Sequence, residues 1–377
     1  MNSLGDVTIR VDASSDIGIG HVRRCMILAR RLRGDGFAVR LIGAQQFGAA
    51  IEPLVEDMPV FWLDARAGGI EREQNQDNEV WDAQVTMSII GRHPSRVSWV
   101  VVDHYRLGER WEMMIREAGH RVLAIDDFRN RKHCADILVA DSAAPFDPRL
   151  NSCAGKAQML AGVEFALVDP EFAFSEQGPI PAGGGRRILI SYGGADPTDE
   201  TSKALEAVRL LRQDGHSREW LGTVDVVVGP ANMRATQLRA QAKGMKDVVV
   251  HVAPESLVPF MRVADMFLTA GGNSMIEALT MRKPCLVTQT SENQALMVDQ
   301  LRVQRAIRVL GNHAMVGPRD VMKAMAKLHS DYEQFSREVR ARPLFDHFGA
   351  RRISAAIQSM SSGDPSIDHH GVIEAMS

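Results

Sequence analysis

The sequence predicts an α/β protein made of two doubly wound domains, each built around a parallel sheet. Short apolar runs typical of buried strands alternate with helix-like segments along most of the chain. Strands separated by helices at this spacing form βαβ units, which set the strands parallel. The length of 377 residues also exceeds what one ordinary core covers, so we expect two domains.

The first half of the chain supplies one set of alternating elements. In a helix-like stretch over residues 21–36, Val22, Cys25 and Met26 begin an apolar face at helical spacing, and glycines near its end provide a stop. The polar stretch after residue 64 predicts a surface excursion ahead of another helix. Strands are expected over residues 7–14, 37–43, 98–105 and 121–127.

A stretch rich in proline and glycine interrupts the alternation near the middle of the chain. Residues 170–185 contain a glycine triplet and prolines, which favours a linker between domains. One domain with a long surface loop is the alternative. Strand and turn segments then resume over residues 186–197, 224–230, 247–253, 264–272 and 283–290.

Composition and charge argue against several classes of protein. A formal net charge of −3 is unlike that of most nucleic-acid-binding proteins. The arginine pairs at 23–24 and 186–187 are expected to be solvated surface charge, and binding of a phosphate is the alternative. No apolar run approaches a membrane span or a signal-peptide core. Four well-separated cysteines without zinc spacing predict a reduced, cytoplasmic protein with no bound metal: Cys25, Cys134, Cys153 and Cys285.

Ligands of doubly wound sheets bind beyond the carboxyl ends of the strands, and several candidate residues follow strands in this sequence. The glycine pairs at 193–194 and 271–272, the turn around Gly18 and Gly20, and the carboxylates Asp103, Asp126 and Asp127 all do so. We expect them to gather in a cleft between the domains.

The segment "TAGGNSMIEAL" is the most informative glycine site. Gly271 and Gly272 allow the backbone to approach a ligand, and Asn273 or Ser274 is expected to cap the helix that follows. Free amides there would bind a phosphate, with Glu277 near a sugar hydroxyl. A capped helix after a tight turn is the alternative. The absence of a P-loop and of a Rossmann fingerprint disfavours ATP and NAD.

His21 is the sharpest catalytic candidate. It stands at the start of a helix directly behind two glycines, where the helix dipole disfavours its charged form and leaves it neutral near pH 7, as a general base requires. A histidine bonded to a local carbonyl is the plainer interpretation. His104, between Asp103 and Tyr105, has the same two interpretations.

Six segments together carry a resemblance to a known family. They are "VDASSDIGIGHVRRC", "VVDHYRL", "AIDDFRNRKHCADILV", "SYGGADPTDET", "TAGGNSMIEAL" and "SENQ", in that order. In this combination the chain resembles the UDP-sugar hydrolases of the pseudaminic acid pathway and their spore-coat polysaccharide relatives, from about residue 7 to residue 353.

The resemblance implies the fold of the GT-B glycosyltransferases, with two Rossmann-like domains, an interdomain cleft and a last helix that crosses back. It divides the chain into a sugar-binding and water-activating domain (1–172), a linker (173–185), a UDP-binding domain (186–343), the returning helix (344–360) and a flexible tail (361–377). It also implies a monomer whose partner is a small UDP-sugar.

The implied reaction removes UDP from UDP-2,4-diacetamido-2,4,6-trideoxy-β-L-altropyranose, with inversion at the anomeric carbon and no cofactor. A GT-B glycosyltransferase is the main alternative; a hydrolysing 2-epimerase and an inactive nucleotide-sugar-binding protein are others. Asn273, where serine or threonine is expected, and Tyr192, where phenylalanine is commoner, leave the exact sugar open.

By the same resemblance, His21 positions and deprotonates the attacking water. The residues implied on the substrate side are Gly18, Gly20, Asp103, His104, Tyr105, Asn293 and Gln294. Those implied around the nucleotide are Gly193, Gly194, Gly271, Gly272, Asn273, Ser274 and Glu277.

Overall fold

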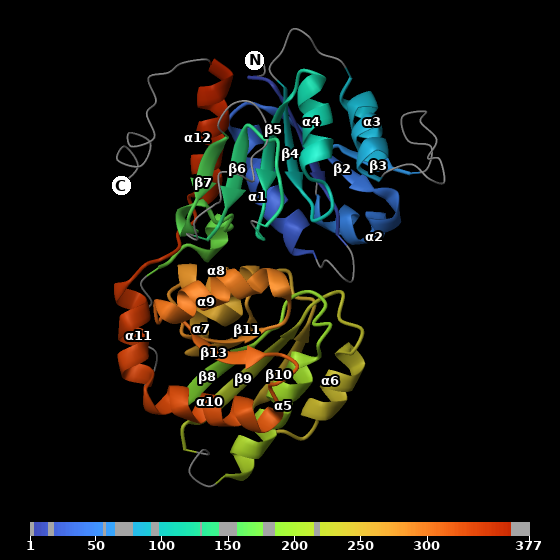
Figure 1. Ribbon diagram of the computed structural model, residues 1–377. Coiled ribbons are helices and arrows are strands. Elements are labelled where there is room, and N and C mark those ends of the chain that lie inside the picture. Colours follow the sequence, from blue (N-terminus) through green and yellow to red (C-terminus); the bar gives the residue numbers. More distant parts are fainter. Residues whose placement is uncertain are drawn as a thin grey trace. The chain divides into compact units, whose positions relative to one another are not determined.

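The computed structural model divides the chain into two compact units, Met1–Leu167 with Phe348–Ser377, and Val168–His347. The chain thus leaves the first unit, forms the whole of the second and returns (Figure 1). The structure describes residues 4–13, 19–55, 58–64, 78–91, 98–128, 130–142, 157–175, 185–214 and 219–362.

The first unit is built on a parallel sheet that is seven strands wide over the described residues, in the order β3-β2-β1-β4-β5-β6-β7. Its strands are β1 (Asp6–Val11), β2 (Ala38–Ala44), β3 (Val60–Leu63), β4 (Ser98–Asp103), β5 (Arg121–Ile125), β6 (Ile137–Ala140) and β7 (Gln158–Ala161). Its helical elements are α1 (Gly20–Gly34), η1 (Gln45–Phe47), α2 (Gly48–Ile51), η2 (Glu52–Leu54), α3 (Asn78–Ile90), α4 (Glu109–Glu117), η5 (Val163–Phe165) and α12 (Gly349–Ser362).

Both faces of this sheet are buried, which explains the unbroken apolar run from Trp99 to Val102 in the central strand β4. Along β4, Val101 belongs to a core that α1 and α12 cover, whereas Val100 and Val102 belong to a second core that α3 and α4 cover. Alternate residues of a strand point to opposite faces, so one valine run fills both cores.

The second unit contains a parallel sheet of six described strands, in the order β10-β9-β8-β11-β12-β13. Figure 1 shows α7, α8 and α9 over one face of this sheet and α5, α6 and α10 over the other. The strands are β8 (Arg186–Ile190), β9 (Leu221–Val228), β10 (Val248–Val252), β11 (Met266–Ala270), β12 (Cys285–Gln289) and β13 (Arg308–Asn312). The helical elements are η6 (Pro170–Phe172), α5 (Glu200–Gln213), α6 (Ala235–Ala242), α7 (Val258–Val263), α8 (Asn273–Thr280), η7 (Glu292–Gln294), α9 (Ala295–Val303), α10 (Pro318–Ser330) and α11 (Tyr332–Ala341).

The chain passes to the second unit a little before the boundary expected at residue 172. Phe172, in η6, is buried, and η6 packs against α8, which places residues 168–172 in the second unit. Within the expected linker, residues 176–184 lie outside the described residues, as do residues 363–377 of the expected tail.

The helix α12 is an integral part of the first unit. It packs against α1, and Ile353 and Ile357 are fully buried in the core beneath. Gly349 begins the helix where any Cβ would collide with the carbonyl oxygen of Ala166, so only glycine permits this approach. The Ser354 hydroxyl donates to Asp35 at 2.6 Å.

The cysteines differ from one another. Cys25 and Cys285 are buried free thiols, whereas Cys134 is disulfide-bonded. The expectation that all cysteines are reduced is therefore wrong at Cys134. Among the helices that the structure describes, none is both long and apolar enough to cross a bilayer.

Candidate active site

The candidate site of the first unit lies where β1, β4 and β5 end. The order of the sheet reverses between β1 and β4, and ligands of such sheets bind at this switch point. Asp12 follows β1, Asp103 ends β4 and Asp127 follows β5. Gly20 is the first residue of α1, and Gly18 lies outside the described residues.

His21 forms a short hydrogen bond with Asp103. Its Nδ1 lies 2.6 Å from Oδ1 of Asp103, and the two side chains are 7% and 1% exposed. Because a carboxylate only accepts hydrogen bonds, Nδ1 carries the proton. In the neutral ring Nε2 is then the nitrogen without a proton, which is the form that a general base needs.

Arg24, one turn further along α1, holds Asp103 in place. Its Nε and Nη2 donate to the two oxygens of Asp103, each at 2.6 Å, and its Nη1 donates to Asp127 at 2.9 Å. Burial alone would raise the pKa of Asp103, but the charge of Arg24 and the hydrogen bonds from Arg24 and His21 hold it well below its usual range. The expectation that the 23–24 pair is solvated surface charge is therefore wrong for Arg24, which is buried. Arg23 is exposed.

His104 lies beside Asp103, but both of its ring nitrogens are engaged. Nε2 lies 3.1 Å from Oδ2 of Asp12, and Nδ1 accepts the backbone N–H of Arg106 at 3.1 Å. Burial lowers the pKa of His104 more than its hydrogen bond to Asp12 raises it. The geometry therefore fixes His104 as a neutral ring whose single proton lies on Nε2.

A buried ion-pair network supports Asp12 from behind. Arg10 donates to Asp12 through Nη1 at 2.6 Å and to Asp82 through Nη2 at 2.8 Å. Asp82, on α3, also accepts from Nε1 of Trp111 on α4 at 2.8 Å. This network connects β1 to both helices on one face of the sheet and so fixes the residue that orients His104.

Two aromatic side chains pack next to His21. The ring of Tyr105 meets that of His21 edge to face, with centroids 4.6 Å apart. Phe128, after β5, meets Tyr105 in the same manner at 5.0 Å. The structure thus places two of the predicted residues, Asp103 and Tyr105, in contact with His21.

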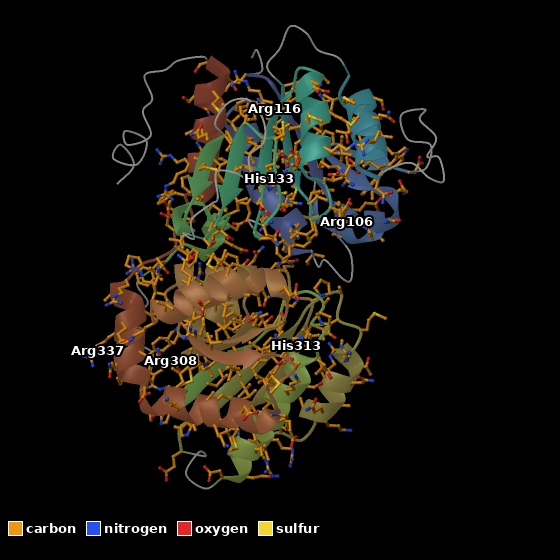
Figure 2. All side chains as sticks on the ribbon, in the orientation of Figure 1. Arg106, Arg116, His133, Arg308, His313 and Arg337 are labelled. Atoms are coloured by element: carbon orange, nitrogen blue, oxygen red, sulfur yellow. The ribbon has the colours of Figure 1, made fainter. Side chains whose placement is uncertain are left out.

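A third histidine lies deeper in the same unit. His133, labelled in Figure 2, is fully buried, with Nδ1 2.8 Å from Glu112 and Nε2 3.2 Å from Asp126. Burial lowers the pKa of His133, but the hydrogen bonds to Asp126 and Glu112 outweigh it and raise the pKa to about 9. Each nitrogen faces a carboxylate, so this imidazole is charged at neutral pH.

In the second unit, α8 begins directly after the glycine pair at the end of β11. Gly272 is the N-cap residue, and among the described residues around it no side chain caps the helix. The expectation that Asn273 or Ser274 is the cap is therefore wrong, because both lie in the first turn. An N-terminus without a side-chain cap presents amides and a positive dipole end to an anion.

The two glycines of this pair have different surroundings. A Cβ on Gly271 would collide with Cγ2 of Val298 on α9, whereas the nearest atom to a Cβ on Gly272 is Nε2 of Gln294, 3.9 Å away. Gly271 therefore allows α9 to pack closely, whereas a Cβ on Gly272 would make only an ordinary van der Waals contact with the described residues.

The loop after β8 is built differently from the loop after β11. Gly193 adopts φ +83°, and Gly194 follows it. The carboxylate of Asp196 accepts the backbone N–H groups of Glu200 and Thr201, both at 2.9 Å. A carboxylate thus already occupies the N-terminus of α5, so the segments "SYGGADPTDET" and "TAGGNSMIEAL" are not equivalent anion sites.

The remaining predicted residues lie around α8. Oε1 of Gln294 accepts the backbone N–H of Gly271 at 3.2 Å and that of Thr290 at 2.9 Å, which connects the ends of β11 and β12. Asn293 accepts from the hydroxyl of Ser291 at 2.5 Å. Glu277 is half-buried on α8. Across the described residues, no group of three or more His, Cys, Asp or Glu side chains is arranged to hold a metal ion.

This architecture is that of a two-domain α/β protein of the GT-B type, as the sequence predicts. The structure resembles MurG of Acinetobacter baumannii, with a TM-score of 0.59, 14% identity and coverage of 94% of this chain and 100% of that one. It also resembles a UDP-GlcNAc 2-epimerase of Neisseria meningitidis bound to UDP-GlcNAc, with a TM-score of 0.60, 10% identity and coverage of 93% and 99%. At these identities the likeness shows the fold alone.

Sequence comparison gives more particular relatives, although no family model matches the chain. The chain is 25% identical over 207 residues to the spore coat polysaccharide biosynthesis protein SpsG of Bacillus subtilis, covering 55% of this chain and 60% of that protein. It is 23% identical over 167 residues to the UDP-2,4-diacetamido-2,4,6-trideoxy-β-L-altropyranose hydrolase of Campylobacter jejuni, covering 44% and 53%. The matches span only about half to three-fifths of these relatives, and they confirm the resemblance seen in the motifs.

Proposed function

We propose that the protein hydrolyses a UDP-linked 2,4-diacetamido-2,4,6-trideoxyhexose and releases UDP and the free sugar, as a step of pseudaminic (nonulosonic) acid biosynthesis. The observation that carries this proposal is the hydrogen bond between His21 Nδ1 and Asp103, which directs the proton-accepting nitrogen of a neutral imidazole away from the carboxylate. The similarity to the Campylobacter jejuni hydrolase supports the choice of substrate.

In the proposed step, Nε2 of His21 accepts a proton from water while the water oxygen attacks C1 of the sugar. The bond between C1 and the diphosphate oxygen breaks, UDP leaves with the bonding electrons, and the configuration at C1 inverts. The anion of Asp103 stabilises the imidazolium that forms. General base catalysis of this kind contributes roughly 10²–10⁴-fold to the rate.

The second unit would bind the nucleotide. The amides at the start of α8, opened by Gly272, would bind the diphosphate and take up the charge that develops as UDP leaves. Glu277 would bind the ribose, and Asn293 with Gln294 the diphosphate or sugar. These groups would act without a metal ion.

The main competing function is glycosyl transfer from a UDP-sugar, since the same nitrogen could deprotonate an acceptor hydroxyl and glycosyltransferases share this fold. The test incubates the purified protein with UDP-2,4-diacetamido-2,4,6-trideoxy-β-L-altropyranose in H₂¹⁸O, without an acceptor and with EDTA. We expect one UDP per sugar by ³¹P NMR and one ¹⁸O on C1. Turnover only with an added acceptor would establish a transferase instead.

Nucleotide binding without any turnover would indicate the third possibility, an inactive UDP-sugar-binding protein. If EDTA abolishes turnover, the reaction requires a metal ion; this result would refute the metal independence but not the hydrolysis. A cytoplasmic monomer is part of the same proposal, and size-exclusion chromatography with light scattering tests the monomer.

A further inference from the structure

Arg24 connects the His21–Asp103 pair to a second carboxylate. Its guanidinium forms paired hydrogen bonds with Asp103 on one side and with Asp127 on the other, the latter at 2.9 and 3.1 Å. Its Nη2 also lies 3.2 Å from Nδ1 of His21. Arg24 and Asp127 side chains are 9% and 13% exposed, so water screens these charges weakly.

The formal charges of this group balance when His21 takes up a proton. With a neutral imidazole, one guanidinium and two carboxylates leave a net charge of −1, and with an imidazolium the sum is zero. Among the described residues, the groups that face His21 are Asp103 from β4, Arg24 from α1 and Tyr105 from the loop after β4, and the thiol of Cys25 donates to Asp103.

We propose that Arg24 and Asp127 are positioning residues that set how readily His21 accepts a proton, with Asp127 acting through Arg24 and without touching the imidazole. Arg24 fixes both oxygens of Asp103, which orients the ring. Asp127 offsets the positive charge that Arg24 brings to within 3.2 Å of Nδ1. The catalytic meaning of this inference rests on the proposed function, whereas the electrostatic relationship does not.

The proposal requires the two residues to act in opposite directions. Without the charge of Asp127, the guanidinium is left partly uncompensated beside His21 and disfavours the imidazolium. Without the charge of Arg24, two carboxylates remain near His21 and favour the imidazolium. If both residues had only a structural role, the two substitutions would shift the titration midpoint of His21 in the same direction or leave it unchanged.

The test follows the His21 Cε1–H resonance with pH in protein labelled with ¹³C-histidine and free of substrate, with the signal assigned through His21→Asn among the 12 histidines. We expect the titration midpoint to fall by about one pH unit in Asp127→Asn and to rise by about one unit in Arg24→Gln. Arg24→Lys, which keeps the charge, should lie closer to the wild type than Arg24→Gln.

A matched control is Asp35→Asn, because Asp35 is also paired with an arginine of α1, Arg31, at 2.8 Å but at the other end of the helix. In Asp35→Asn, the titration midpoint of His21 should be the same as in the wild type. An unchanged or raised His21 titration midpoint in Asp127→Asn would overturn the proposal. If Arg24→Gln does not fold, the result for Asp127→Asn alone decides.

The titration uses no substrate, so it separates this inference from the proposed function. If the protein does not hydrolyse UDP-sugars but the two midpoints move apart, the inference stands and the function fails. If hydrolysis occurs, the acidic limb of kcat/KM should move in each variant in the same direction as the NMR midpoint.

Discussion

Asp103 accepts the Nδ1 proton of His21 at 2.6 Å, while His104, its neighbour in the chain, has both ring nitrogens bonded within the protein. Two histidines that look alike in the sequence therefore differ in what they can do. His21 has a nitrogen directed away from its carboxylate, and His104 is held as a neutral, fully bonded ring.

Replacing His21 should impair turnover without impairing nucleotide binding. In His21→Asn we expect kcat to fall by about 10²–10⁴-fold because the general base is lost. The affinity for UDP, measured by calorimetry, should stay within a few-fold, since the proposed nucleotide residues belong to the second unit. Unchanged kcat would remove His21 from the mechanism.

Replacing His104 should affect stability more than the pH profile. His104→Ala leaves Asp12 without one of its buried partners, so we expect a loss of about 1–3 kcal/mol in the free energy of unfolding, measured in urea. The midpoints of the kcat/KM profile should not move. A shifted midpoint would mean that His104 takes part in proton transfer.

The glycine pair before α8 provides a matched comparison. Gly271→Ala should lower the unfolding free energy by about 1–3 kcal/mol, because its Cβ collides with Val298. Gly272→Ala should leave stability nearly unchanged but weaken UDP binding, because the methyl group occupies the space that a diphosphate would use. Undiminished UDP affinity in a folded Gly272→Ala protein would contradict the proposed diphosphate site.

Glu277→Ala should mainly weaken UDP binding, which calorimetry would measure. If Glu277 bonds the ribose, the variant should discriminate less between UDP and uridine analogues that lack a ribose hydroxyl. The same affinity for UDP as in the wild type would refute the ribose assignment.

His133 should make the protein less stable at alkaline pH. Its folded-state pKa of about 9 exceeds the ordinary value of 6.5, so its contribution is fully present below pH 6.5 and is lost as the pH rises through 9. The linked free energy is about 3 kcal/mol. Urea unfolding at several pH values should show this decline in the wild type, and His133→Asn should lack that part of it.

The fold was predictable because its signals are local. Valine runs such as residues 100–102 are what a strand buried on both faces requires, and glycine turns after them indicate crossovers to helices. The partners of His21 were harder to predict from the sequence. The sequence identifies Asp103 as a carboxylate that follows a strand, but its contact with Arg24 joins residues 79 positions apart, which no spacing rule anticipates.

A signal for part of the site was nevertheless present. Arg10 lies within β1 and Asp12 directly follows it, and charged groups at the end of a buried strand must be paired because burying them alone is costly. That pattern could have indicated the network behind His104. Asp196, whose carboxylate accepts at the N-terminus of α5, has a positive φ of 46°, a backbone conformation that no local pattern in the sequence predicts.

The return of α12 to the first unit also limits which fragments of the chain can be expressed as folded domains. A fragment that stops after Leu167 would contain the strands β1–β7 yet lack Ile353 and Ile357, which belong to the core that α1 covers. Isolating this half would therefore call for a circular permutation or a short bridge from residue 167 to residue 348. The intervening half, being continuous in the chain, is the one suited to separate expression.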